Sequence, residues 1–169
     1  VCSFFIKNGE AKSSALLVLW FGVLALFVGF SDMLGGYDRY IYGELFDEVA
    51  DVRLAGGDVK TAYIFELYAS EWGFSWLNVG ISYITANRYI FILILTISIY
   101  VLLFISFIRY VDNYPFAIML FMGLIFFFTF TYLRQLLGVG IGWLSITYAY
   151  KRNLLKFLAV VLLATLIHN

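Results

Sequence analysis

Cysteine, histidine and charge are scarce in this sequence of 169 residues. The single cysteine, Cys2, excludes an intramolecular disulfide and a thiolate metal cluster. Eleven Lys and Arg residues balance eleven Asp and Glu residues, so no basic field is present that would attract nucleic acid. A phosphate-cradling glycine loop, a serine-hydrolase elbow and an HExxH motif are also missing. The sequence therefore predicts no nucleic-acid partner, no cofactor and no metal centre.

Apolar residues, in contrast, make up 63% of the chain, and the mean hydropathy is +0.93. Lipid forces a backbone to satisfy its own hydrogen bonds, so long apolar runs predict membrane-spanning helices. We expect an all-α fold, a polytopic membrane helix bundle with about five spans and short amphipathic helices at its outer face. The expected spans are 14–30, 89–108, 115–133, 136–150 and 154–168, of which the last two are short.

No internal repeat, low-complexity tract or flexible linker divides the chain, so residues 1–169 are expected to form one integral membrane domain. The sequence begins without methionine and stops directly after "LLATLIHN", with no polar tail. We therefore expect a piece of a longer protein, truncated at its C-terminus.

The charges between the expected spans differ in sign. Short basic clusters beside span ends mark the cytoplasmic side of a membrane. With the N-terminus inside, the cytoplasmic segments hold six bases (Lys7, Lys12, Arg109, Lys151, Arg152 and Lys156) against Glu10 and Asp112. The outer segments hold nine acids between Asp32 and Glu71, against five bases. The loop of about 31–88, Arg134 and His168 are thus expected to share the outer face of the membrane.

The outer loop carries helical patterns of its own. Ile41, Leu45, Val49 and Val52 recur on one helical face, and the pair Gly56–Gly57 is a stop signal. Asp58 is placed to cap a second, short helix. The acids Asp47, Glu48 and Asp51 could bind a divalent cation, but a solvated helix face is the preferred interpretation.

A third pattern in this loop predicts an amphipathic helix that lies in the outer interface or dips into it. Its apolar stripe is Phe74, Leu77, Ile81 and Ile84, and its polar residues on other faces are Ser75, Asn78, Ser82 and Thr85. The segment is too polar to predict a span.

Arg134 is a permanent charge between two apolar runs, neither of which offers an acidic partner. Its planar guanidinium suits the oxygens of a phosphate, although an arginine at a helix end can also reach the interface simply to stay hydrated. His168 could move a proton or donate to a phosphate, or could be an interfacial histidine. Asp38 and Glu71 could each be a base or a helix cap. Together, two carboxylates, one arginine and one histidine on one side suit transfer from a phosphate leaving group, which needs a base for the acceptor hydroxyl and cations for the departing charge.

The order of motifs resembles the EpsG family of bacterial exopolysaccharide polymerases, relatives of Wzy-type polymerases. The motif "GYDRYIYGELF" keeps Gly36, Asp38, Tyr42 and Phe46, but has Arg39 where tyrosine is usual. The motif "SEWGFSWLN" keeps Glu71, Gly73, Phe74, Leu77 and Asn78, with Trp72 in place of proline. The last two motifs keep Arg134, Gln135 and Leu137 in "LRQLLG" and His168 in "LIHN", with Gly138 for alanine and Ile167 for phenylalanine.

This resemblance implies a membrane glycosyltransferase related to the GT-C type. The donor would be a glycan on polyprenyl pyrophosphate, the acceptor a second lipid-linked repeat unit, and the surroundings membrane lipid and other polysaccharide-assembly proteins. Arg134 and Gln135 would bind the pyrophosphate with help from His168, and Asp38, or else Glu71, would be the base. The substrate-binding residues would be Arg39, Tyr42, Asn78 and Arg88.

Three other interpretations stay open at this point. A ligase or another polyprenyl-phosphate glycosyltransferase would use the same residues with a different acceptor. A transporter or flippase subunit should carry charges near the bilayer midplane and paired repeats, which the sequence does not show. A purely structural membrane protein predicts that Asp38, Arg134 and His168 lie far apart.

Overall fold

The computed structural model describes residues 14–31, 34 and 36–169. These residues form nine α-helices and one 3-10 helix and contain no strand, which confirms the all-α prediction. One of the described helices, α5 (Arg88–Tyr110), is long and apolar enough to cross a membrane. Shorter apolar helices are α1 (Ser14–Gly29), α6 (Tyr114–Leu124) and α9 (Leu154–Ile167). The number of spans therefore stays a prediction, and Cys2, Lys7, Glu10, Lys12 and Asp32 lie outside the described residues.

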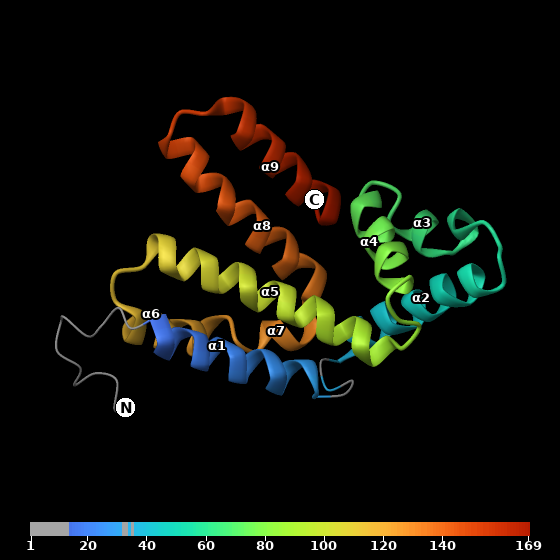
Figure 1. The fold of residues 1–169 in the computed structure, drawn as a ribbon, viewed down its shortest axis with the longest axis horizontal. Coiled ribbons are helices and arrows are strands. Elements are labelled where there is room, and N and C mark those ends of the chain that lie inside the picture. Colours follow the sequence, from blue (N-terminus) through green and yellow to red (C-terminus); the bar gives the residue numbers. More distant parts are fainter. Residues whose placement is uncertain (1–13, 32–33, 35) are drawn as a thin grey trace.

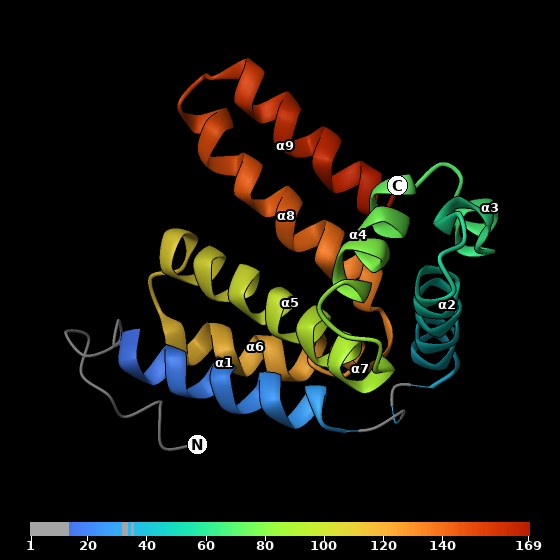
Figure 2. The same ribbon diagram turned by 45° about the vertical axis from the view of Figure 1, so that its right-hand side comes forward.

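The long helices run side by side, and the short ones gather at one end. Helices α1 and α5 pack along their lengths, and α6 and α7 (Phe128–Thr131) lie beside them (Figure 1). Helix α8 (Leu133–Tyr150) and α9 form a hairpin that packs on α5 through α8 and then diverges from it (Figure 2). The far end of this hairpin meets the short helices, since α9 contacts α4 (Trp72–Ser82).

Asparagine side chains begin three of these helices. The side chain of Asn87 accepts a hydrogen bond from the backbone N–H of Tyr89 at 2.8 Å, at the start of α5. Asn113 and Asn153 do the same for α6 and α9. Such caps satisfy N–H groups that the first helical turn leaves without a partner. They also fix where each apolar run turns back.

An aromatic cluster fills the space between α1, α5 and α6. Phe21 of α1 packs edge-to-face on Phe107 at 4.9 Å and on Phe121 at 5.5 Å between ring centroids. Tyr100 completes the cluster at 5.9 Å from Phe21, and all four residues are buried. Edge-to-face pairs of this kind stabilise a core beyond the area that they bury.

The predicted span 115–133 is not one continuous helix. Helix α6 ends at Leu124 and α7 begins at Phe128. Thr129 fixes the break, because its hydroxyl donates to the carbonyl of Phe126 at 2.6 Å and lies 3.1 Å from the Tyr100 hydroxyl. The surrounding run of phenylalanines and threonines has a weak helix propensity, so these tertiary contacts decide the backbone.

The predicted helices of the 31–88 segment are present. Helix α2 (Tyr37–Leu54) ends before Gly56, which has φ +73°, and Asp58 caps the 3-10 helix η2 (Val59–Thr61) through the N–H of Lys60 at 3.0 Å. Helix α3 (Ile64–Leu67) and α4 follow.

The prediction for the faces of α4 was wrong in part. Phe74 and Ile81 are buried as expected, but Ser75, Asn78 and Ser82 are buried as well, and Ile84 is exposed beyond the helix end. Local hydrogen bonds make this possible: the Ser75 hydroxyl donates to the carbonyl of Ile64 in α3, and the Asn78 amide donates to the carbonyl of Phe74. A small polar side chain that is satisfied in this way can pack inside.

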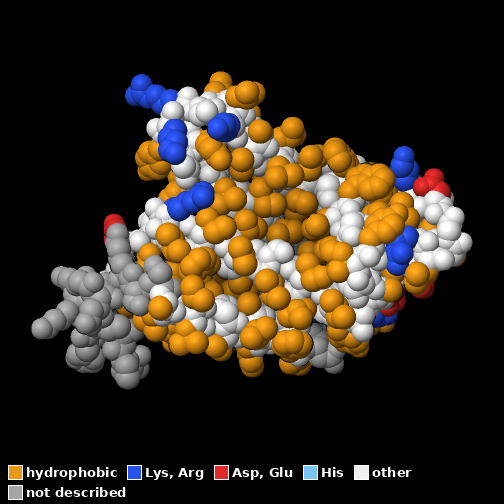
Figure 3. Space-filling model, in the orientation of Figure 1, with side chains coloured by type: hydrophobic (Ala, Val, Ile, Leu, Met, Phe, Trp, Pro, Cys, Tyr) orange, Lys and Arg blue, Asp and Glu red, His pale blue; other side chains and the backbone are white. Residues whose placement is uncertain are grey.

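The two ends of the molecule carry different charges (Figure 3). Exposed Lys151, Arg152 and Lys156 lie at the turn between α8 and α9. The opposite end, with α2 and α3, carries charges of both signs, which include the exposed acids Asp51, Asp58 and Glu66 and the exposed Lys60. Hydrophobic side chains cover most of the visible face between these ends. This distribution agrees with the charge pattern expected from the sequence.

Candidate functional site

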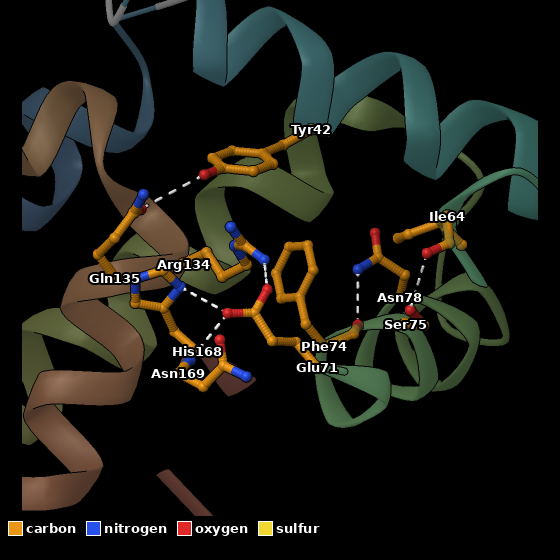
Figure 4. A network of polar contacts seen from close by, with 10 residues as sticks. All are labelled: Tyr42, Ile64, Glu71, Phe74, Ser75, Asn78, Arg134, Gln135, His168 and Asn169. Atoms are coloured by element: carbon orange, nitrogen blue, oxygen red, sulfur yellow. Dashed lines mark hydrogen bonds and ion pairs between the residues drawn. The ribbon is translucent and has the colours of Figure 1, made fainter. Parts of the chain in front are cut away.

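A buried carboxylate, Glu71, is the centre of the polar cluster drawn in Figure 4. Its Oε2 accepts a hydrogen bond from Nη1 of Arg134 in a direct ion pair. Its Oε1 accepts the backbone N–H of Asn169 at 2.8 Å and lies 2.9 Å from Nδ1 of His168. The side chains of Glu71 and Arg134 are only 7% and 11% exposed. Three of the predicted site residues, Glu71, Arg134 and His168, therefore meet, although they are far apart in the sequence.

Glycines allow the helices that carry these side chains to approach closely. A Cβ atom added at Gly73, in the first turn of α4, would lie 2.7 Å from the carbonyl oxygen of Leu166 in α9. A Cβ atom added at Gly138 of α8 would lie 3.2 Å from the Cβ of His168. The start of α4, the start of α8 and the end of α9 are thus in contact around Glu71.

Arg134 places its positive charge at the start of α8. Arg134 is the second residue of α8, and a helix N-terminus already carries a partial positive charge. The helix dipole therefore does not stabilise the positive charge of the guanidinium, which depends on Glu71 for charge compensation. Its Nε atom is buried and has no hydrogen-bond partner among the described residues. The guanidinium therefore keeps an N–H donor that the described residues leave unused.

Two tyrosines lie beside the guanidinium. The Tyr42 hydroxyl donates to Oε1 of Gln135 at 3.4 Å, and the guanidinium carbon of Arg134 lies 4.0 Å from the centre of the Tyr68 ring. Burial raises the pKa of Tyr42 to about 12, although Arg134 acts in the opposite direction. Burial also raises the pKa of Tyr68. Both hydroxyls therefore keep their protons and remain donors near neutral pH.

Asp38 lies in the first turn of α2 and is half-buried. Its negative charge raises the pKa of both Tyr42 and Tyr68, and its place in the cluster stays a prediction. Neither Asp38 nor Glu71 caps a helix with its side chain, so the capping interpretation is wrong for both acids. Gly36 is the N-cap residue of α2, and Glu71, the N-cap residue of α4, forms no side-chain cap hydrogen bond.

The other predicted substrate-binding residues have structural partners. Arg39 is fully buried, and its Nη2 donates to the carbonyls of Val28 and Gly29 at the end of α1. Arg88 joins the start of α5 to α2 through Glu44, at 2.6 Å, and Asp47. The hydrogen bond from Arg88 lowers the pKa of Glu44. A role for either arginine in substrate binding stays a prediction.

Asn78 is also buried, with one unsatisfied atom. Its Nδ2 donates to the carbonyl of Phe74 at 2.8 Å, while its Oδ1 has no hydrogen-bond partner among the described residues. Asn78 therefore retains an acceptor, and its contact with a sugar stays a prediction.

An apolar groove begins beside the polar cluster. It has a volume of about 450 Å³ and lies between α5, α7 and α8. Gln135 and Tyr132 are at its polar end, and Leu136, Val139 and Trp143 continue it along α8. Within residues 14–31, 34 and 36–169, no three His, Cys, Asp or Glu side chains gather in a way that could hold a metal ion.

The sequence did not predict that Tyr68 and the backbone N–H of Asn169 contribute to the site. Tyr68 follows α3 and lies outside every motif quoted above, and its aromatic type alone does not distinguish it from the other twelve tyrosines. A backbone donor such as the N–H of Asn169 leaves no signal in a sequence. Only the tertiary arrangement reveals these two contributions.

Comparison with known proteins agrees with the motif order. The model of the EpsG family matches residues 4–169, nearly the whole chain. No curated protein and no solved structure matches the chain. The family match covers all the motifs that contain Asp38, Glu71, Arg134 and His168. The chain therefore belongs to the EpsG family.

Proposed function

We propose that this protein is a polysaccharide polymerase that moves a glycan from polyprenyl pyrophosphate to a lipid-linked repeat unit at the outer face of the bacterial cytoplasmic membrane. Membership of the EpsG family suggests a function of the exopolysaccharide-polymerase type. The observation that carries the specific reaction is the convergence of Glu71, Arg134 and His168 in one polar cluster. A purely structural membrane protein was expected to keep Asp38, Arg134 and His168 far apart, whereas Arg134 and His168 both lie against Glu71.

Arg134 is the proposed ligand of the pyrophosphate. Its guanidinium is permanently charged and presents planar donors that match phosphate oxygens. Gln135 and His168 assist it from the same end of the hairpin, and the N-terminus of α8 adds positive potential. Charge that develops on the departing diphosphate is thereby stabilised by groups that are already in place.

Asp38 is the proposed base. The acceptor hydroxyl gives its proton to the Asp38 carboxylate, and its oxygen forms a bond to the anomeric carbon of the donor sugar. The bond between that carbon and the diphosphate oxygen breaks, and polyprenyl pyrophosphate leaves with the electron pair. Glu71 is the weaker candidate, because a carboxylate in an ion pair with Arg134 holds a proton less readily.

The groove along α8 supports a lipid-linked donor. Its lining is apolar from Leu136 to Trp143, and its polar end reaches Gln135, next to Arg134. A molecule with a diphosphate head and an isoprenoid tail has the same two-part character. Tyr42 and Asn78 are the proposed sugar-positioning groups.

Replacement of Arg134 by alanine tests this function. We expect cells that produce the full protein with Arg134→Ala to make no long polymer, because the leaving group loses its main cation. The measurement is polymer length on a gel at matched protein levels. The control is Arg109→Ala, which removes an exposed arginine at the end of α5 and should leave chain lengths unchanged. Normal polymer with Arg134→Ala would eliminate the proposal.

A further inference from the structure

The side chain of Tyr68 is held from two directions. Tyr68 is the C-cap residue of α3, and its backbone N–H donates to the carbonyl of Ile64 at 3.0 Å. Its ring packs edge-to-face on Phe74, with 5.8 Å between centroids. Phe74 is itself fully buried in α4. The ring is therefore a fixed surface.

This surface meets the guanidinium of Arg134. The guanidinium carbon lies 4.0 Å from the centre of the Tyr68 ring and 5.9 Å from that of Phe74. The donors of a guanidinium lie in its own plane, so a ring near the group attracts the cation without accepting those N–H bonds. The aromatic contact also compensates for part of the water that Arg134 loses in a side chain that is 11% exposed.

The in-plane donors of Arg134 are only partly used by the described residues. Glu71 accepts from Nη1, while Nε has no hydrogen-bond partner among them. A polar contact at Nη1 fixes one point of the guanidinium but not its plane. The Tyr68 ring, at 4.0 Å the nearer of the two rings beside it, limits how the group can turn about that point.

We propose that Tyr68 is a positioning residue that holds the guanidinium of Arg134 in the orientation that receives the diphosphate of a lipid-linked donor. This inference rests on the proposed function. On this proposal, the segment between α3 and α4 places one aromatic ring next to Arg134. It also explains why an arginine, and not a lysine, suits this position, since an ammonium group has no plane to orient.

The test is a double-mutant cycle on the full protein, purified in detergent, with a polyprenyl-pyrophosphate-linked repeat unit as substrate. Tyr68→Phe keeps the ring, and we expect its kcat/KM to stay within about 2-fold of the unmodified protein. Tyr68→Leu removes the ring, and we expect kcat/KM to fall by about 3- to 30-fold, the size of a cation–π contact. The loss should appear mainly in KM for the donor. In an Arg134→Lys background, Tyr68→Leu should lower kcat/KM little further.

Tyr63→Leu is the matched control, since Tyr63 is 51% exposed and immediately precedes α3. It should leave kcat/KM unchanged. Tyr68→Met is a second ring-free variant, and thermal unfolding of each protein identifies any that does not fold. Should the Leu variant fail to fold, the Met variant replaces it in the cycle.

Two results would overturn the role of Tyr68. One is an unchanged kcat/KM with Tyr68→Leu or, in its place, Tyr68→Met. The other is the same fold-loss of kcat/KM on removal of the ring in the protein with Arg134 and in the Arg134→Lys protein. Either result, together with loss of transfer in Arg134→Ala, leaves the proposed function intact. Undiminished transfer with Arg134→Ala would instead remove the proposed function itself.

Discussion

A nearly buried ion pair holds its place only while both partners remain, because either charge left alone is costly. Glu71 and Arg134 depend on one another in this way. Asp38 differs, since it is half-buried at the start of α2 and its charge raises the pKa of Tyr42 and Tyr68. The two acids of the site therefore have separable tasks. On the proposed function, Glu71 holds the cation in place and Asp38 takes the proton.

Charge-neutral variants should separate these tasks. We expect Asp38→Asn to reduce the transfer rate by about 10²- to 10⁴-fold, the usual contribution of a general base, with little change in thermal unfolding. Glu71→Gln should lower both the transfer rate and the unfolding temperature, because Arg134 loses its counter-charge. Asp51→Asn, at an exposed position of α2, is the control for both measurements. An active Asp38→Asn protein would show that Asp38 is not the base.

At the scale of elements, the site depends on how closely α4 approaches α9. Gly73 has no room for a side chain beside the backbone of Leu166, whereas Gly80 of the same helix faces open space. The ion pair of Glu71 with Arg134 forms next to this contact. A change in the distance between α4 and α9 should therefore disturb the site without removing any of its charged groups.

Two alanine substitutions in α4 test this dependence. Gly73→Ala should lower the free energy of unfolding by about 1–3 kcal/mol, as overpacking does, and should reduce transfer by moving Glu71. Gly80→Ala should be neutral or slightly stabilising, since alanine favours a helix and meets no atom. Thermal unfolding and transfer rate are the two measurements. Equal behaviour of the two variants would contradict the importance of the α4–α9 contact.

Several elements could be predicted from the sequence because local signals determine them. The stop at Gly56–Gly57 and the cap at Asp58 depend only on neighbouring residues, and both are present. The break between α6 and α7 depends on the distant Tyr100, and the inward polar face of α4 depends on its packing against α3. Periodicity alone cannot include such tertiary partners.

The site could be predicted as a set of residues but not as an arrangement. The charge pattern placed Arg134 and His168 on one expected side, together with the acids of the 31–88 segment. It could not show that Glu71 pairs with Arg134, because the two residues are far apart in the chain. They meet because α4 packs on α9, which in turn packs on α8, the helix that carries Arg134. The same limit explains why Tyr68 carried no signal.

The whole molecule separates its charges along its length. Exposed bases lie at the turn between α8 and α9, and the polar cluster lies at the opposite end with α2, α3 and α4 (Figures 1 and 3). An apolar surface and α5, the helix of span length among the described residues, connect the two ends. Such an arrangement suits a protein that meets its lipid-linked substrate at one membrane face.

Release of the lipid carrier is the most direct test of this account. The purified full protein would be given repeat units on radiolabelled polyprenyl pyrophosphate, and free polyprenyl pyrophosphate would be counted against new glycosidic bonds. We predict one carrier released for each bond, with both products lost together in Arg134→Ala. Polymer growth without release of the carrier, or equal release with Arg134→Ala, would contradict the claim that this cluster binds the departing diphosphate.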